Sequence, residues 1–378
     1  MTDLNEFTRQ FSMEGATHLY SSLPAMLTPA DLYLVKDNPI HKAALLGCNI
    51  YLIVRRQRIH LKPEGFTLSG RIVTGEFLVL REQGMSAIPF VYEISPSSVP
   101  DEITIQDVAV ALNGTSLIVV TPQSEHLIAV NVIVAGAKSE LEPHDTDLEV
   151  LYVGQSIGQI GSRTALDRLL SHKKFQQILA ETSTHFPERE VLLLLYRFEH
   201  GKTIISNGGD FNVDAQASEE QDSAHLDRLR TVRLNRKEVV SLAEAGLINY
   251  FKPYYNTLLK TTNFSAKDKL KVLKQLMKKG VAGLVVELCS VNLRSRIGTV
   301  HAVPVDLTEI IPIEALDGRN IEEQEIKERW EAQMKEMAHS HFARFPLTTP
   351  QERNTFLHGT KFLDQTEEPW MRSPSASG

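Results

Sequence analysis

The chain has 378 residues, a formal net charge of −7 at pH 7 and two cysteines, which favours two or three domains whose cores need no disulfide bonds. A negative net charge excludes a protein that covers nucleic acid or anionic membrane with its whole surface, although it allows a local basic groove. The polar N-terminal residues lack a signal-peptide pattern, and no apolar run approaches the roughly 20 residues that span a bilayer. We therefore expect a cytoplasmic protein with no membrane partner.

The first third of the chain contains short runs of β-branched and aromatic residues, such as FTLSGRIV and GEFLVLREQ, separated by Gly, Pro, Asn and Ser. Such runs at regular intervals are typical of a β meander, sandwich or barrel. We expect a β-rich domain over residues 1–124. Its basic segment from Arg55 to Lys62 is interpreted as an exposed edge strand, with a ligand-binding face as the alternative.

The pattern changes over residues 125–260, which we expect to form a second domain. Apolar runs predict strands at HLIAVNVIV and LEVLYVG, then a helix from about Thr164 to Thr182, then a buried strand at EVLLLLYRFE. A long acidic loop leads to a helix at RKEVVSLAEAGLINYF, which Pro253 ends. The predicted order is strand, strand, helix, strand, loop, helix.

Beyond residue 260 the sequence predicts an α+β region over residues 261–345 and an extended, partly disordered tail over 346–378. Residues 260–279 contain seven lysines and a single acidic residue. A helix with lysines along one track supplies sequence-independent affinity for a nucleic-acid backbone. A solvated amphipathic helix with a core stripe of leucines explains these lysines equally well, so both interpretations stay open.

Four short motifs of the second domain carry side chains suited to chemistry. The YVG tripeptide at residues 152–154 ends a predicted strand. Arg168 and His172 lie four positions apart on the next predicted helix and so share a face. Glu244 stands among apolar residues on the later helix, and Asn256 closes the stretch FKPYYN. A carboxylate in such surroundings must either reach solvent or serve a function.

This order of motifs resembles the GIY-YIG nuclease family. YVGQS is similar to the second half of the motif that names the family, DRLLSH to its arginine helix, and EAGLINYFKPYYN to its segment with a metal-binding glutamate. The resemblance covers about a third of the chain. It implies an α+β fold whose central module is a small antiparallel sheet flanked by helices. The β-rich domain and the basic C-terminal α+β region would then flank that module.

The resemblance implies a metal-dependent nuclease that hydrolyses phosphodiester bonds in nucleic acid, with DNA favoured over RNA and Mg²⁺ or Mn²⁺ as cofactor. Such hydrolysis needs a cation on the scissile phosphate, an activated water and positive charge near the developing oxyanion. By resemblance, Glu244 would hold the metal and Arg168 would stabilise the phosphate. Tyr152, or His172 beside it, would position or deprotonate the water, and Asn256 would fix the geometry of the site.

Side chains around these motifs would contact the nucleic-acid backbone. Gln155 and Ser156 are expected to donate hydrogen bonds to it. The expected cationic contacts are Arg163, Lys173, Lys174, Lys267, Lys271 and Lys274.

Two features depart from the family pattern. The strand expected to carry the first motif reads VNVIVAG, around residues 131–136, and no tyrosine occurs between Tyr92 and Tyr152. The connection IGQIGSRTAL is longer than usual, which makes Arg163 an alternative to Arg168. The alternative function is a catalytically degenerate module that binds nucleic acid or protein. A protein partner for the N-terminal domain also stays open.

Overall fold

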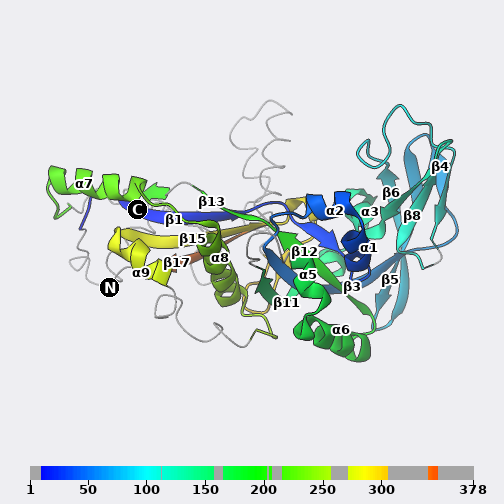
Figure 1. Cartoon of the computed structure of the whole chain (residues 1–378). Coiled ribbons are helices and arrows are strands. Elements are labelled where there is room, and N and C mark those ends of the chain that lie inside the picture. The colour runs from blue at the N-terminus through cyan, green and yellow to red at the C-terminus, as the bar shows by residue number, and fades with distance from the viewer. Residues whose placement is uncertain are drawn as a thin grey trace, which may run out of the picture.

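The computed structural model describes residues 10–111, 113–156, 165–201, 204–206, 215–256, 271–304 and 339–347. Over these ranges the chain is a mixed α+β fold, as expected, and its strands form a nine-stranded, a five-stranded and a three-stranded sheet (Figure 1). Every helix in the described ranges is too short or too polar to cross a bilayer.

The nine-stranded sheet is organised around one long strand, β3 (Ile50–Leu61). The first half of β3 lies between β11 (Leu148–Gln155) and β12 (Arg189–Tyr196), and both pairings are antiparallel. Its second half pairs with β5 (Ile72–Arg81), which forms a hairpin with β6 (Gly84–Glu93). The shorter strands of this sheet are β2 (Ala25–Leu27), β4 (Thr67–Ser69), β10 (Lys138–Ser139) and β16 (Ile297–Gly298). Residues 50–54 of β3 are all buried, as a strand covered on both faces must be.

Residues 58–147 form a lobe with its own hydrophobic core, at the right of Figure 1. The chain enters the lobe through the second half of β3 and returns to the central sheet through β11. The lobe contains a three-stranded antiparallel sheet and two short helices. These elements are β7 (Asp107–Val110), β8 (Ser116–Val120), β9 (Glu125–Ala129), α3 (Val130–Gly136) and α4 (Pro143–Thr146).

The five-stranded sheet joins segments from distant parts of the chain. Its central strand, β1 (Glu14–Ser21), runs parallel to β15 (Val281–Cys289). Around this pair lie β13 (Phe198–His200), β14 (Ile204–Ser206) and β17 (Ser340–Pro346). The remaining helical elements are α1 (Asp31–Asp37), α2 (Pro39–Ala44), α5 (Ala165–Leu170), α6 (Lys173–His185), α7 (Glu219–Arg230), α8 (Arg236–Phe251), α9 (Lys271–Lys278) and the 3-10 turn η3 (Val291–Leu293).

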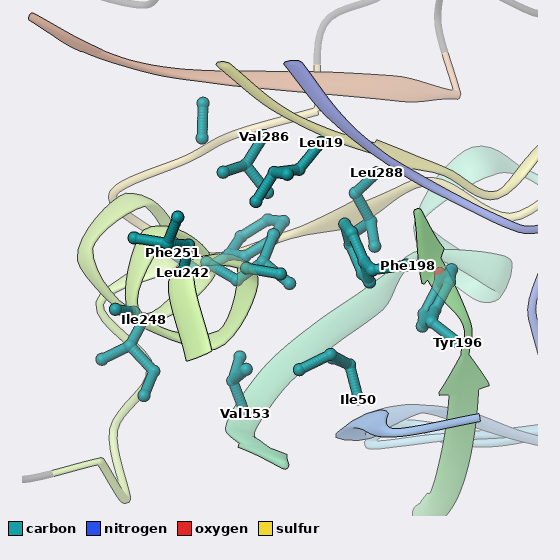
Figure 2. Packing of buried hydrophobic residues seen from close by; sticks show 14 of the residues in the cluster. Leu19, Ile50, Val153, Tyr196, Phe198, Leu242, Ile248, Phe251, Val286 and Leu288 are labelled. Atoms are coloured by element: carbon teal, nitrogen blue, oxygen red, sulfur yellow. The ribbon is translucent and has the colours of Figure 1, made fainter. Parts of the chain in front are cut away.

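Helix α8 packs between the two larger sheets. Figure 2 shows Leu242 and Phe251 of α8 beside Leu19 and Val286 of the five-stranded sheet, with Val153 of the central sheet on the other side. Helix and sheet approach closely because α8 carries a glycine there. A Cβ atom on Gly246 would lie only 2.8 Å from the Val286 Cγ2 atom. The buried contacts of α8 on two sides therefore fix its position against β11.

Four sequence-based expectations are wrong in detail. The basic segment from Arg55 to Lys62 is not an exposed edge strand, because it belongs to β3, which pairs with β11, β12 and β5, and Arg56 is fully buried. The stretch VNVIVAG is helix α3 and not a strand. The helix expected from Thr164 to Thr182 is two helices, α5 and α6, because His172 adopts extended backbone angles (φ −86°, ψ 105°) at the start of α6. The expected boundary at residue 124 does not separate two sheets, since β1, β2 and the first half of β3 pair with strands of the expected second domain. The expected tail lies outside the described residues from position 348 onwards.

Candidate active site

Strands β3 and β11 bring two tyrosines together. Their antiparallel register places Tyr51 opposite Gly154. The Tyr51 and Tyr152 rings stack with centroids 6.3 Å apart, and the His172 ring lies 6.0 Å from Tyr51 and 5.2 Å from Tyr152. Tyr51 is fully buried, whereas Tyr152 and His172 are half-buried. Two phenols and an imidazole therefore share one side of the central sheet.

Gly154 is required by the approach of these rings. A Cβ atom at this position would lie 2.5 Å from the Tyr51 Cζ and Oη atoms and 2.8 Å from the Tyr152 Cε1 atom. Distances this short are far inside van der Waals contact. The glycine of the YVG motif thus has a steric cause, because any other side chain would displace one of the tyrosines.

Asn256 fixes the end of α8 to the open edge of β11. Helix α8 starts with a reciprocal capping box between Asn235 and Glu238 and ends at Lys252, which has left-handed angles (φ 46°) just before Pro253. Four residues after Lys252, the Asn256 side chain accepts a hydrogen bond from the Val153 N–H group and donates one to the Val153 carbonyl, both 2.9 Å long. The amide takes the place of a neighbouring strand, so its contribution is to position the site.

Glu244 lies on α8 and reaches the end of β11. Its carboxylate accepts hydrogen bonds from the Gln155 backbone and side chain, and burial raises its pKa to about 7 while the Arg168 charge opposes that rise. The Gln155 carbonyl oxygen Oε1 is buried and has no hydrogen-bond partner among the described residues. Two side chains with oxygen atoms that can bind a cation, Glu244 and Gln155, are thus in contact with each other.

Arg168 and His172 complete the cluster, although the helix break changes how they meet it. Arg168 is exposed on α5, and its charge acts on Tyr51, Tyr152 and Glu244. Burial lowers the pKa of His172, and Arg168 lowers it further. The His172 Nδ1 atom is buried without a hydrogen-bond partner among the described residues. The imidazole is therefore neutral at pH 7 and can accept a proton.

Burial also raises the pKa of both phenols, well above the usual range for Tyr51. The nearby carboxylate of Glu244 adds to this rise, and Arg168 opposes it. Tyr51 and Tyr152 thus keep their protons at pH 7.

The residues expected to contact nucleic acid are dispersed. Gln155 lies in the cluster, but Ser156 is only 3% exposed, and its backbone N–H donates to the Asn49 carbonyl over 2.7 Å. Lys173 is exposed beside His172, and the Lys174 ammonium donates to the Gln177 side chain over 2.9 Å. Lys271 and Lys274 are exposed on α9, which packs on β15 and is separated from β11 and α5 by α8 in Figure 1. Arg163 and Lys267 lie outside the described residues.

The sequence analysis missed Tyr51. The search for a first-motif tyrosine was confined to the stretch just before YVG, whereas the strand that pairs with YVG begins about 100 residues earlier. The available signal was the apolar run NIYLIV, which has a tyrosine near its start. Nothing in that run specifies its partner strand.

Comparison with protein-family models, with curated proteins and with solved structures yields no match for this chain. Among the described residues, no group of three or more His, Cys, Asp and Glu side chains is arranged to hold a metal ion. Only the cluster around Glu244, within the described part of the chain, therefore bears on the function of this chain.

Proposed function

We propose that this protein is a divalent-metal-dependent nuclease of the GIY-YIG type that hydrolyses phosphodiester bonds, with DNA favoured over RNA. The observation that carries the proposal is the convergence of five functional side chains from separate parts of the chain. They are Tyr51 of β3, Tyr152 of β11, Arg168 of α5, His172 between α5 and α6, and Glu244 of α8. The interrupted module would consist of β3, β11, β12, α5, α6 and α8, with residues 58–147 inserted between its first two strands.

The donor set around Glu244 suits a hard cation. Mg²⁺ prefers oxygen ligands and commonly takes one or two from the protein and the rest from phosphate and water. Glu244 supplies such a ligand, and so does the Gln155 Oε1 atom, which has no hydrogen-bond partner among the described residues. Gln155 also orients the carboxylate through its two hydrogen bonds. When bound, Mg²⁺ or Mn²⁺ would neutralise charge on the scissile phosphate and favour the ionised form of Glu244.

The protonation states divide the remaining roles. The neutral His172, whose Nδ1 atom has no hydrogen-bond partner among the described residues, accepts the proton of the attacking water as the new P–O bond forms. The P–O bond to the departing nucleotide breaks, and its leaving oxygen takes a proton from solvent. The Tyr152 hydroxyl keeps its proton and donates a hydrogen bond to a phosphate oxygen. Arg168 balances the charge that develops on the phosphoryl group. Tyr51 is fully buried and acts as a positioning residue beneath Tyr152 and Arg168.

The alternative of a degenerate binding module rested on the absence of a second phenol. Tyr51 supplies that phenol, which supports retained catalysis. Nucleic acid would reach the cluster from the side on which Arg168 and Lys173 are exposed.

The test compares Glu244→Gln with the unaltered protein on supercoiled plasmid, single-stranded DNA and single-stranded RNA, each with Mg²⁺ or Mn²⁺. The substitution keeps the shape of the side chain but removes its charge, so cleavage should fall by about 100- to 1,000-fold. Glu238→Gln is the matched control. It makes the same chemical change on the same helix, and glutamine preserves the capping box.

Metal-dependent cleavage that is lost only in Glu244→Gln would support the nuclease. Equal cleavage by both variants would assign the activity to another site or a contaminant. Binding of nucleic acid without cleavage under either metal would favour the degenerate module.

A further inference from the structure

A cavity of about 540 Å³ lies between the core sheet and the inserted lobe, apart from the cluster around Glu244. Its wall is formed by α1, the second half of β3, α6, the start of β12, and the lobe segment around β8 and α3. None of the five proposed active-site side chains lines it. The volume lies within the range of pockets that hold a small molecule.

Two polar groups in this wall are buried without partners. Thr182 of α6 is 4% exposed, and its hydroxyl has no hydrogen-bond partner among the described residues. The Nε atom of Arg58 is likewise buried and unpartnered within the described chain, although its Nη2 atom donates to the Arg189 carbonyl over 3.0 Å. A buried polar group without a hydrogen-bond partner destabilises a fold, so two of them in one cavity wall point to a ligand.

Asn131 brings further hydrogen-bond donors to the wall of the cavity. The Asn131 carbonyl oxygen accepts from the Arg56 guanidinium, which leaves the Asn131 amide N–H groups to donate. The two carboxylates of the wall each accept a hydrogen bond from the protein. Glu190 accepts from Arg56 over 2.8 Å, and Asp31 accepts from the Thr28 N–H group over 2.7 Å. The donors of Arg58, Thr182 and Asn131 that have no partner among the described residues therefore suit a ligand group that accepts hydrogen bonds.

We propose that this cavity binds a small molecule through a phosphate or carboxylate group, with Arg58, Thr182 and Asn131 as its donors. Arginine matches the geometry of both oxyanions, and donors from three elements suit a group with several oxygens. Apolar side chains in the same wall cover the body of the ligand. They include Pro29, Leu34, Leu179 and Val191. The volume suits a molecule of the size of a nucleoside monophosphate.

The site is independent of the proposed nuclease, although one helix serves both. Helix α6 begins next to His172 and lines the cavity with Thr182, a separation of about 15 Å along the helix axis. Loss of one function can therefore be told from loss of the other by variants at each end of α6.

The experiment measures calorimetric affinity and thermal stabilisation of the full chain with adenosine monophosphate, inorganic phosphate, citrate and adenosine. Asn131→Asp keeps the acceptor for Arg56 but replaces the donor with a negative charge, so oxyanion affinity should fall at least 10-fold. Asn38→Asp is the matched control, because Asn38 caps α2 outside the cavity and aspartate caps equally well. Glu244→Gln should bind these ligands as the unaltered protein does.

Thr182→Val separates a binding role from a structural one. Removal of an unpartnered buried hydroxyl should leave the ligand-free protein as stable as before or more stable, and should weaken oxyanion binding. Adenosine monophosphate and citrate together distinguish a phosphate from a carboxylate ligand. The proposal is overturned if phosphate, adenosine monophosphate and citrate all show no binding at ligand concentrations up to about 10 mM, roughly ten times a dissociation constant of 1 mM. It is also overturned if Asn131→Asp and Thr182→Val bind these ligands as tightly as the unaltered protein.

Discussion

The polar side chains at the start of β3 and those in its middle differ in whether they have hydrogen-bond partners. At the start, the ring of Tyr51 meets Tyr152 and His172, and the His172 Nδ1 atom lacks a partner among the described residues. In the middle, the fully buried Arg56 is bound by Glu190, and Arg55 makes two hydrogen bonds to Glu149. The charged groups in the middle of β3 are therefore paired with opposite charges. The groups at its start also have shifted pKa values, a combination that is typical of functional sites and supports the proposed one.

The contrast extends to the attachment of the inserted lobe. Asp145 is fully buried and accepts from both the Nε and the Nη2 atoms of Arg81. Asp147, just before β11, accepts from two nitrogen atoms of Arg296. The Arg81–Asp145 pair ties the last helix of the lobe to β5, and the Arg296–Asp147 pair fixes the start of β11.

The largest expected effect comes from breaking the buried Arg81–Asp145 pair. Arg81→Leu leaves the Asp145 carboxylate buried without its cation, which should cost about 3–5 kcal/mol of unfolding free energy. Lys62→Leu is the control, because the Lys62–Glu76 pair lies on the same lobe but is about 40% exposed, and it should cost less than about 1 kcal/mol. Urea unfolding measures both. Equal losses would mean that the buried pair adds nothing special to the attachment.

The next effect is a pH dependence centred on Glu244. Its pKa is about 7 in the folded protein and 4.5 when unperturbed, so the unfolded chain loses this proton first. Stability should therefore fall as the pH rises from about 4.5 to 7 and then level off, by up to about 3 kcal/mol. Glu244→Gln should lose this component. Unfolding curves at pH 5 and pH 8 measure it, and an identical slope in the two proteins would refute the assignment.

The smallest of these effects tests whether the Tyr51 ring requires a glycine at position 154. Gly154→Ala should cost about 1–3 kcal/mol because the new methyl group overlaps the Tyr51 ring. Tyr51→Ala opens that space, so the cost of Gly154→Ala should shrink in its presence. A double-mutant cycle gives this coupling. Additive losses would show that the overlap is relieved elsewhere.

Local sequence predicted those parts of the fold that depend on neighbouring residues. The strands β11 and β12 and the helix α8 are where periodicity and the helix-ending Pro253 put them. Tyr152, His172 and Glu244, which the structure brings near one another, each lie within or beside such an element. Arg168 and His172 were expected on one helix, but Arg168 lies on α5 and His172 at the break before α6. The sequence did not predict this break because no proline or glycine stands there.

What the sequence could not supply was the pairing of distant strands. The alternation in VNVIVAG is apolar enough for a strand, but it folds as α3, where the Cβ position of Gly136 closely approaches the Tyr92 ring. The run NIYLIV predicts a strand but does not indicate which strands pair with it. The register that sets Tyr51 against Gly154 is decided by packing across the whole central sheet.

The insertion between β3 and β11 also bears on how the chain folds. Pairing Ile50 with Gln155 closes a loop of about 100 residues, and such closure is slow when the intervening chain is unfolded. The lobe has its own hydrophobic core, and once it has formed, the effective loop shrinks to the short distance between its two attachment strands. Folding of the lobe should therefore precede and accelerate assembly of the central sheet, so that a region without any of the five proposed active-site residues sets the rate at which the active site forms.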